Sequence, residues 1–283
     1  MSLLTRRTLI AQGAAATLAA PALAQPRGGG WTYEQYVVAM RASERRAAMS
    51  KTTFDGVMRR REQALRIVET YLRGKFQEAD AHTLRAYAEV PREYYHYNYA
   101  GPFDFGHAAY EGNAHPWAIG YGSALSDYLG QMYMTQLARP LPGESALEIG
   151  TGSGYQISIL SRVCAKARSI EIIEPLGRAV AKIFKPLGFD NIASRVGDGY
   201  FGWPEEKDGF DIIMVTCVAQ HVPPPLLAQL KPGTGRLIIP VGQPFRRAQV
   251  LYVYTKDRDG KIHSRRDVGV YFIPMTGRIS QGR

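Results

Sequence analysis

The residues best placed to do chemistry lie near the middle of the chain, where three glycines alternate with small polar residues. The stretch 145–155 is Ser-Ala-Leu-Glu-Ile-Gly-Thr-Gly-Ser-Gly-Tyr. Its apolar residues predict a short buried strand, and residues 156–163 predict a helix. Glycine accepts left-handed backbone and lets the main chain approach a ligand closely. Glu171 follows about twenty positions on, where an acidic side chain would bind ribose hydroxyls. The pattern predicts the opening of a nucleotide-binding α/β unit.

The spacing of the glycines distinguishes between ligands. A dinucleotide fingerprint needs a small residue at its sixth position, so that the helix can pack on the strand. Tyr155 occupies that position, and the third glycine, Gly154, comes one place early. This spacing, with Glu148 two residues before Gly150, resembles the S-adenosylmethionine site of class I methyltransferases. A site for NAD or FAD and a tight turn without a ligand remain as alternatives.

Strands and helices are expected to alternate on both sides of this turn. Residues 210–216 form a nearly continuous apolar run, which is typical of a buried parallel strand. Alternation followed by terminal strands predicts a doubly wound, mainly parallel, seven-stranded α/β sheet with an antiparallel edge. The other expected strands end at Glu171 or cover residues 193–196, 236–241, 250–254 and 268–273, and the expected helices cover 128–137, 177–187 and 226–230.

The chain before the first expected strand divides into three parts. Residues 25–30 form a Pro/Gly linker, and residues 31–75 predict one or two amphipathic helices that pack on the main domain. Residues 101–122 are rich in glycine, proline, histidine and aromatic residues without a period, which predicts a long ordered loop. His107 and His115 in this loop are more typical of hydrogen-bonded residues than of metal ligands.

The first 24 residues have the parts of a twin-arginine export signal. Arg6 and Arg7 precede a mild apolar run, and Ala22-Leu23-Ala24 has the form of a cleavage site. The expected organisation is a signal at 1–24, a helical extension at 25–89 and a catalytic domain at 90–283. The signal predicts a periplasmic protein. The alternative is a cytoplasmic protein whose N-terminus forms a helix with two solvated arginines.

Composition limits the classes of partner. The chain has 283 residues and a formal net charge of +10, which favours acidic partners only weakly. It has no nucleic-acid motif, no run after residue 30 long enough to span a membrane, and no Cys/His pair at zinc spacing. Cys164 and Cys217 are expected to be buried thiols, although export would permit a disulfide between them. A monomer is expected.

Seven segments form a pattern that extends well beyond the glycine turn. They are Val-Pro-Arg-Glu at 90–93, Leu-Glu-Ile-Gly-Thr-Gly-Ser-Gly-Tyr-Gln at 147–156, Ser-Ile-Glu at 169–171, Gly-Asp-Gly at 197–199, Val-Pro-Pro-Pro-Leu-Leu at 222–227, Ile-Pro-Val-Gly at 239–242 and Pro-Met-Thr-Gly at 274–277. From about Val90 to Gly277, the chain thereby resembles the protein-L-isoaspartate O-methyltransferase family, because these segments follow the family's order and lie at close to its spacings.

The resemblance implies S-adenosylmethionine as methyl donor and a carboxylate oxygen of an isoaspartyl residue, in a damaged protein or peptide, as acceptor. It places Glu171 at the ribose, Asp198 beside the adenine and Ser126 at the site of methyl transfer. The full set of expected cofactor-binding residues is Glu148, Gly150, Gly152, Gly154, Glu171, Asp198 and Gly199.

The acceptor segment departs from the family pattern Gly-Gln-Thr-Ile-Ser-Gln-Pro. Ser123 and Ala124 replace its glutamine and threonine, and Asp127-Tyr128 replaces Gln-Pro. A methyltransferase acting on another carboxylate or small molecule, and a non-catalytic relative, therefore remain as alternatives. Ser126 could also cap the helix expected from about Tyr128 instead of orienting an acceptor.

The export signal gives a direct prediction. A reporter fused to residues 1–30 should reach the periplasm, as cell fractionation would show. Changing Arg6 and Arg7 to lysine should block export, because lysine keeps the charge but lacks the planar guanidinium. A reporter that stays in the cytoplasm with both arginines intact would contradict the signal.

Overall fold

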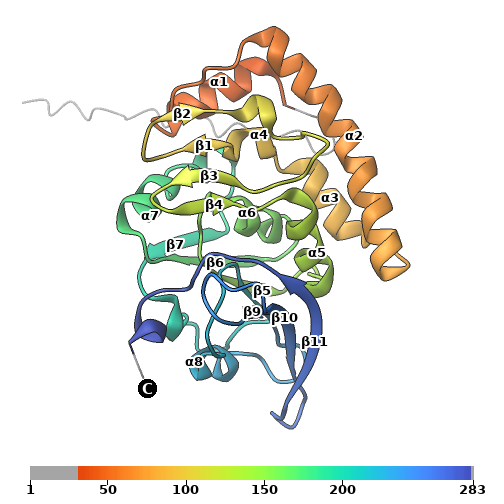
Figure 1. The fold of residues 1–283 in the computed structure, drawn as a ribbon, viewed down its shortest axis with the longest axis vertical. Coiled ribbons are helices and arrows are strands. Elements are labelled where there is room, and N and C mark those ends of the chain that lie inside the picture. The colour runs from red at the N-terminus through yellow and green to blue at the C-terminus, as the bar shows by residue number, and fades with distance from the viewer. Residues whose placement is uncertain (1–30, 282–283) are drawn as a thin grey trace, which may run out of the picture.

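A seven-stranded sheet lies at the centre of the structure, a computed structural model that describes residues 31–281. The predicted signal and linker lie outside these residues. The strands are β5 (Ser145–Ile149), β6 (Lys166–Glu171), β7 (Ile192–Val196), β8 (Ile212–Val215), β9 (Arg236–Val241), β10 (Gln249–Lys256) and β11 (Ile262–Val270). Their order across the sheet is β11-β10-β9-β8-β5-β6-β7 (Figure 1).

The sheet is parallel except at β10, which runs antiparallel to both β9 and β11. The chain moves outward from β5 to β6 and β7 on one side, and from β8 to β9 on the other. The direction of winding therefore reverses between β5 and β8. Ligands of open α/β sheets bind at the carboxyl ends of the strands at such a point. The predicted doubly wound, mainly parallel sheet is confirmed.

Alternate residues of the central strands enter two cores on opposite faces of the sheet. Ile212 and Met214 belong to one core, and Ile213 and Val215 belong to the other. Because side chains alternate across a strand, β8 must be apolar at every position, and this explains its continuous run. Helices α5 (Tyr128–Ala138), α6 (Tyr155–Ser161) and α7 (Glu174–Val180) contribute to the first core, and α8 (Pro224–Ala228) contributes to the second.

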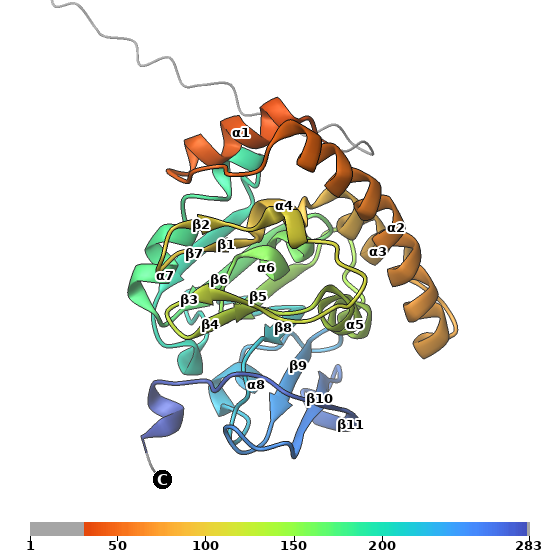
Figure 2. The ribbon, with the colours of Figure 1, turned by 45° about the horizontal axis from the view of Figure 1, so that its top comes forward.

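The helices before the sheet belong to the first core as well. They are α1 (Tyr33–Ala42), α2 (Lys51–Phe76), α3 (Ala81–Glu89) and α4 (Arg92–Tyr95). Figure 2 shows α2 beside α3 and α5, and its buried Val57, Val68 and Leu72 join the same core as the sheet. The extension thus packs on the main domain, as the sequence indicates; the domain boundary at residue 89 stays a prediction.

Three sequence-based assignments were wrong. The helix expected at 177–187 is α7, which begins three residues earlier and ends at Val180. Residues 101–122 are not one loop, because short strands and a 3₁₀ turn over Gly106–Ala108 lie in and around them. These strands span two to four residues, too few for a period to show in the sequence. The last strand ends at Val270, not 273, and begins at Ile262, where exposed charged residues of an edge strand conceal it. The short strands are β1 (Tyr97–Asn98), β2 (Phe103–Asp104), β3 (Trp117–Gly120) and β4 (Ser123–Leu125).

Both cysteines are buried free thiols, as the sequence predicts, and no disulfide joins them. Burial raises the pKa of Cys164 to about 12. Within residues 31–281, no group of three or more His, Cys, Asp and Glu could hold a metal ion. No helix in the same part of the chain has the length and apolar character that crossing a membrane requires.

The start of the sheet depends on one buried carboxylate. Asp211, just before β8, accepts hydrogen bonds from Ser145 N at 2.9 Å, Lys231 Nζ at 2.7 Å and Thr234 Oγ1 at 2.6 Å. Burial alone would raise the pKa of Asp211, but these hydrogen bonds outweigh it and hold the pKa at about 2. The ionised form therefore ties β5 to β8.

Asp211→Asn should lower the free energy of unfolding at pH 7 by about 1–3 kcal/mol, because it weakens charge-assisted hydrogen bonds at a buried site. The folded-state pKa lies below the ordinary value of 3.8, so the carboxylate's contribution is present above pH ~4 and lost as the pH falls toward 2. Urea titrations from pH 7 to pH 3 should show that the difference in free energy of unfolding between variant and wild type decreases as the pH falls. A constant gap would contradict this role.

Candidate cofactor and acceptor site

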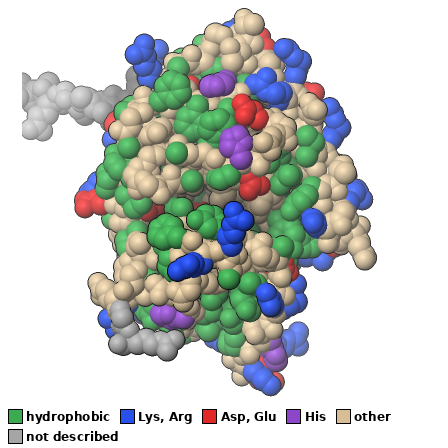
Figure 3. All heavy atoms as spheres, viewed as in Figure 1, with side chains coloured by type: hydrophobic (Ala, Val, Ile, Leu, Met, Phe, Trp, Pro, Cys, Tyr) green, Lys and Arg blue, Asp and Glu red, His purple; other side chains and the backbone are tan. Residues whose placement is uncertain are grey.

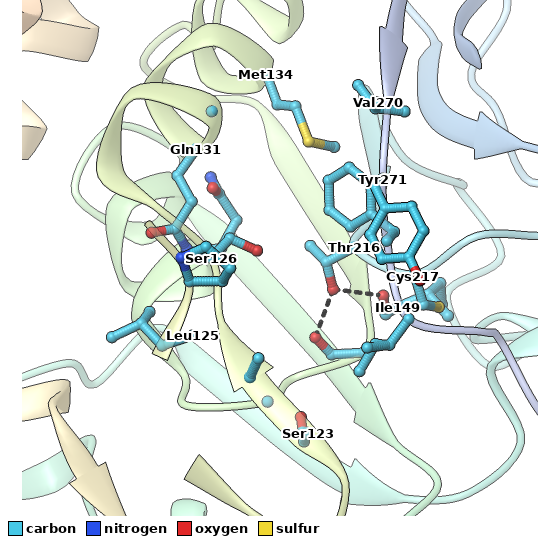
Figure 4. Close-up of a pocket in the computed structure, with 18 of the residues that line it drawn as sticks. Ser123, Leu125, Ser126, Gln131, Met134, Ile149, Thr216, Cys217, Val270 and Tyr271 are labelled. Carbon is cyan, nitrogen blue, oxygen red and sulfur yellow. Dashed lines mark hydrogen bonds between the residues drawn. The ribbon is translucent and has the colours of Figure 1, made fainter. Parts of the chain in front are cut away.

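A cavity of about 980 Å³ opens at the carboxyl ends of β5 and β8. The glycine turn after β5 forms one wall, the β4–α5 segment forms a second, and the last part of the chain forms a third (Figure 4). The cavity thus lies where the winding of the sheet reverses. It brings together six of the eight predicted site residues: Ser126, Glu148, Gly150, Gly152, Glu171 and Gly199.

The two central strands are joined at the cavity floor by a threonine. Thr216 Oγ1 donates to the carbonyl oxygens of Gly150 at 2.7 Å and Ile149 at 3.1 Å (Figure 4). Gly150 has φ +93°, and a Cβ there would lie 2.7 Å from Thr216 Oγ1. Any larger residue would therefore disturb this contact. Thr216 was not predicted as a site residue. Its position directly after a buried strand, where the winding of the sheet reverses, does indicate a place in a ligand site.

Gly152 leaves room in the cavity itself. Its φ is +52°, and a Cβ there would have no protein atom nearer than 3.8 Å. Gly152 N donates to Glu171 Oε2 at 2.8 Å, and Ile173 N donates to Glu171 Oε1 at 3.0 Å. Burial raises the pKa of Glu171, and these backbone hydrogen bonds oppose the rise. The acidic side chain and the open glycine therefore face the same space.

Glu148 lies beneath the turn and is almost completely buried. Its Oε2 accepts from Ser169 Oγ at 2.6 Å, and Ser169 Oγ lies 2.7 Å from Thr151 Oγ1. This chain of hydrogen bonds fixes the turn to β5 and β6. Burial raises the pKa of Glu148 well above its usual range, which favours the neutral acid. Its Oε1 makes no hydrogen bond to any described residue.

Two predicted cofactor residues do not line the cavity. A Cβ on Gly154 would lie 2.9 Å from the Phe184 ring, so this glycine allows close packing on the side away from the cavity. Asp198 accepts from Tyr200 N at 2.9 Å and from Arg278 N at 2.6 Å, and thereby fastens the C-terminal segment. The adenine contact of Asp198 stays a prediction. Gly199 does line the cavity, where a Cβ would lie 2.3 Å from Ile149 Cγ2.

Ser126 is not the cap of α5. Asp127 takes that role, since its Oδ1 accepts from Gly130 N at 2.7 Å. The Ser126 carbonyl accepts from Arg92 Nη2 at 2.6 Å, and no hydrogen bond of its hydroxyl to residues 31–281 is present. The hydroxyl is thus available to a ligand in the cavity. The aspartate at 127, which departs from the family pattern, therefore supplies a helix cap.

The mouth of the cavity is aromatic. Tyr121, Phe245 and Tyr271 line it and remain 42%, 73% and 62% exposed, respectively. Figure 3 shows hydrophobic and basic side chains gathered near the middle of this face. Exposed apolar clusters of this kind commonly mark surfaces that bind a partner. A peptide could therefore reach the cavity across this rim.

Comparison with known proteins identifies the family. The family model "Protein-L-isoaspartate(D-aspartate) O-methyltransferase (PCMT)" matches residues 64–280. The chain belongs to this family. Protein-L-isoaspartate O-methyltransferase 1 of Nitrosospira multiformis is 47% identical over 163 residues, which are 58% of this chain and 68% of the relative. The Opitutus terrae protein-L-isoaspartate O-methyltransferase is 45% identical over 197 residues, 70% of this chain and 80% of the relative.

Solved structures agree with this assignment. A protein-L-isoaspartate O-methyltransferase superposes with a TM-score of 0.65 at 26% identity, covering 77% of this chain and 67% of that one. A Plasmodium falciparum relative in complex with S-adenosyl-L-homocysteine has a TM-score of 0.60 at 23% identity, covering 74% and 96% of the two chains. The second likeness shows the fold.

The family uses S-adenosylmethionine, and the cavity fits it. Glu171 offers a carboxylate at the position where ribose hydroxyls are bound in such folds. The space beside Gly152 and the unpaired oxygen of Glu148 are further features of a site for a polar ligand. The methyl donor would therefore be held by the glycine turn and Glu171, in the cavity that Ser126 also lines.

Gly152→Ala should weaken binding of S-adenosylhomocysteine by about tenfold or more, because the added methyl enters the cavity. It should also lower stability by about 1–2 kcal/mol, since alanine is strained in left-handed backbone. Gly188→Ala is the matched control, because Gly188 has φ +68° and open surroundings away from the cavity. Calorimetry should find a similar loss of stability in both variants. Binding of S-adenosylhomocysteine should be weaker only in Gly152→Ala. Equal affinities would contradict the assignment of the turn.

Proposed function

We propose that this protein transfers the methyl group of S-adenosylmethionine to the α-carboxylate of L-isoaspartyl residues in damaged proteins and peptides. Family membership supports the reaction. The observation that carries the proposal for this chain is that one cavity contains both the glycine turn and the unengaged Ser126 hydroxyl. The proposal includes a monomer as the active state.

The reaction asks the protein mainly to position and enclose its substrates. A carboxyl group with a pKa of ~4 is already ionised at neutral pH, so no general base is required. The bound donor supplies an electrophilic methyl group on a sulfonium sulfur. Ser126 would donate a hydrogen bond to one carboxylate oxygen and thereby aim the other at the methyl, at about 3–3.5 Å. The aromatic rim would exclude water from the contact.

The methyl ester then permits repair without further help from the enzyme. Attack of the following backbone nitrogen on the ester carbonyl forms a succinimide and releases methanol. Hydrolysis of the succinimide gives a mixture of normal aspartyl and isoaspartyl residues. Repeated cycles of methylation would therefore return the damaged residue to the normal backbone.

A second candidate is methylation of another carboxylate. The altered segment with Ser123, Ala124 and Asp127 favours it, because these residues line the cavity next to Ser126. Export to the periplasm belongs to the proposal as well. The twin-arginine route carries folded proteins, so cofactor bound in the cytoplasm could travel with the enzyme.

Ser126→Ala should reduce kcat/KM for an isoaspartyl peptide by about tenfold to a hundredfold. The reason is loss of one hydrogen bond to a charged group, about 1.5–3 kcal/mol. The assay follows labelled methyl transfer to paired peptides that differ only in an isoaspartyl or a normal aspartyl linkage. Affinity for S-adenosylhomocysteine should be unchanged, because Ser126 lies outside the glycine turn.

Two results would overturn parts of this proposal. Cofactor binding without transfer to either peptide would move the acceptor to another carboxylate, and a screen of small carboxylic acids would then be decisive. Full activity of Ser126→Ala on the isoaspartyl peptide would remove Ser126 from the acceptor site while leaving the reaction in place.

A further inference from the structure

Gln131 lies one turn of α5 beyond the acceptor segment and lines the cavity. It is only 7% exposed. Figure 4 shows its side chain reaching from the helix toward Ser126. A buried amide that reaches a binding cavity must satisfy both its oxygen and its nitrogen, since an unpaired polar group is costly.

A buried arginine fixes which end of this amide faces the cavity. Arg92 Nη1 donates to Gln131 Oε1 at 2.5 Å. A guanidinium has donors only and no acceptor. The oxygen of Gln131 is therefore held against Arg92, and the amide nitrogen is left as a free donor. Among residues 31–281, no acceptor for Gln131 Nε2 is present, and that atom is not sealed from solvent.

Arg92 sets the position of Ser126 at the same time. Its Nη2 donates to the Ser126 carbonyl at 2.6 Å and its Nε donates to the Ala109 carbonyl at 3.2 Å. Arg92 is only 1% exposed, and its guanidinium lies over the Tyr155 ring, 5.0 Å from the ring centre. Its partners among the described residues are neutral oxygens. One rigid cation thus holds the backbone of Ser126 and the amide of Gln131 in a single arrangement.

We propose that Gln131 Nε2 is a second hydrogen-bond donor to the acceptor carboxylate, so that Ser126 and Gln131 form a two-donor clamp held in place by Arg92. The inference rests on the proposed function and adds a residue to its acceptor site. An ionised carboxylate has two oxygens that only accept hydrogen bonds. Two neutral donors on one side of the cavity match that group better than they match a hydroxyl or an amine.

Gln131→Glu separates this role from a purely structural one. Glutamate keeps an oxygen for Arg92 but replaces the cavity donor with a second oxygen, which repels a carboxylate. KM for the isoaspartyl peptide should rise by about tenfold or more, the factor expected for losing a hydrogen bond to a charged group. The affinity for S-adenosylhomocysteine and the midpoint of thermal unfolding should be the same as in wild type. Gln131→Met, which removes both polar atoms, should also raise KM.

Gln136→Glu is the matched control. Gln136 is a buried glutamine on the same helix whose Oε1 accepts from Asp80 N at 2.9 Å, and it lies outside the cavity lining. The control should leave KM unchanged. The clamp would be overturned if wild type methylates the isoaspartyl peptide and Gln131→Glu and Gln131→Met have the same KM for that peptide as wild type and the control. Wild type that methylates neither peptide of the pair would overturn the proposed function, and the clamp with it.

Discussion

The site depends on the close approach of two parallel strands whose connections leave in opposite directions. At this point the Gly150 carbonyl and the Thr216 hydroxyl are 2.7 Å apart, and a Cβ on Gly150 would collide with that hydroxyl. The missing side chain lets β5 and β8 end side by side above a shared floor. The glycine turn, the β4–α5 segment and the C-terminal segment then meet over that floor, because each begins or ends near it.

The N-terminal helices contribute to the site through buried charge. Glu93 accepts hydrogen bonds from Trp31 Nε1 at 2.5 Å and Tyr110 Oη at 2.6 Å, and lies 3.6 Å from the Arg61 guanidinium. Arg92, next to it in the chain, instead holds the acceptor segment. Breaking a buried ion pair leaves an uncompensated charge, which is strongly destabilising. The segment before the sheet therefore fixes the acceptor side of the cavity as well as covering the core.

Much of the fold and six of the eight predicted site residues could be recognised from the sequence, because their signals are local. The strand, glycine turn and helix around Gly150 identified the central unit, and the acidic residue at Glu171 came at the expected distance. Gln131 and Arg92 could not be recognised in this way. They meet across 39 positions of the chain, and neither has a type or spacing that indicates a role by itself. Asp198 has a similar long-range contact that its local motif does not reveal, since it accepts a hydrogen bond from the backbone of Arg278, 80 positions away.

The charges around the cavity explain why neutral donors suit its acceptor side. Three acidic side chains line it, but each is compensated locally: Glu148 by burial that favours its neutral form, Glu171 by two backbone N–H groups, and Asp127 by the N-terminus of α5. A carboxylate loses its negative charge as it accepts a methyl group. A cation in direct contact would stabilise the ionised substrate more than the transition state, and so would slow the reaction. Arg92 binds the Ser126 carbonyl and the Gln131 amide oxygen but does not line the cavity, so in the proposed clamp it would order the two donors without contacting the substrate. In the proposed arrangement, the rigid cation of Arg92 positions the two donors, whereas the neutral donors bind the acceptor carboxylate. Their hydrogen bonds to the carboxylate can weaken as it loses its charge during methyl transfer.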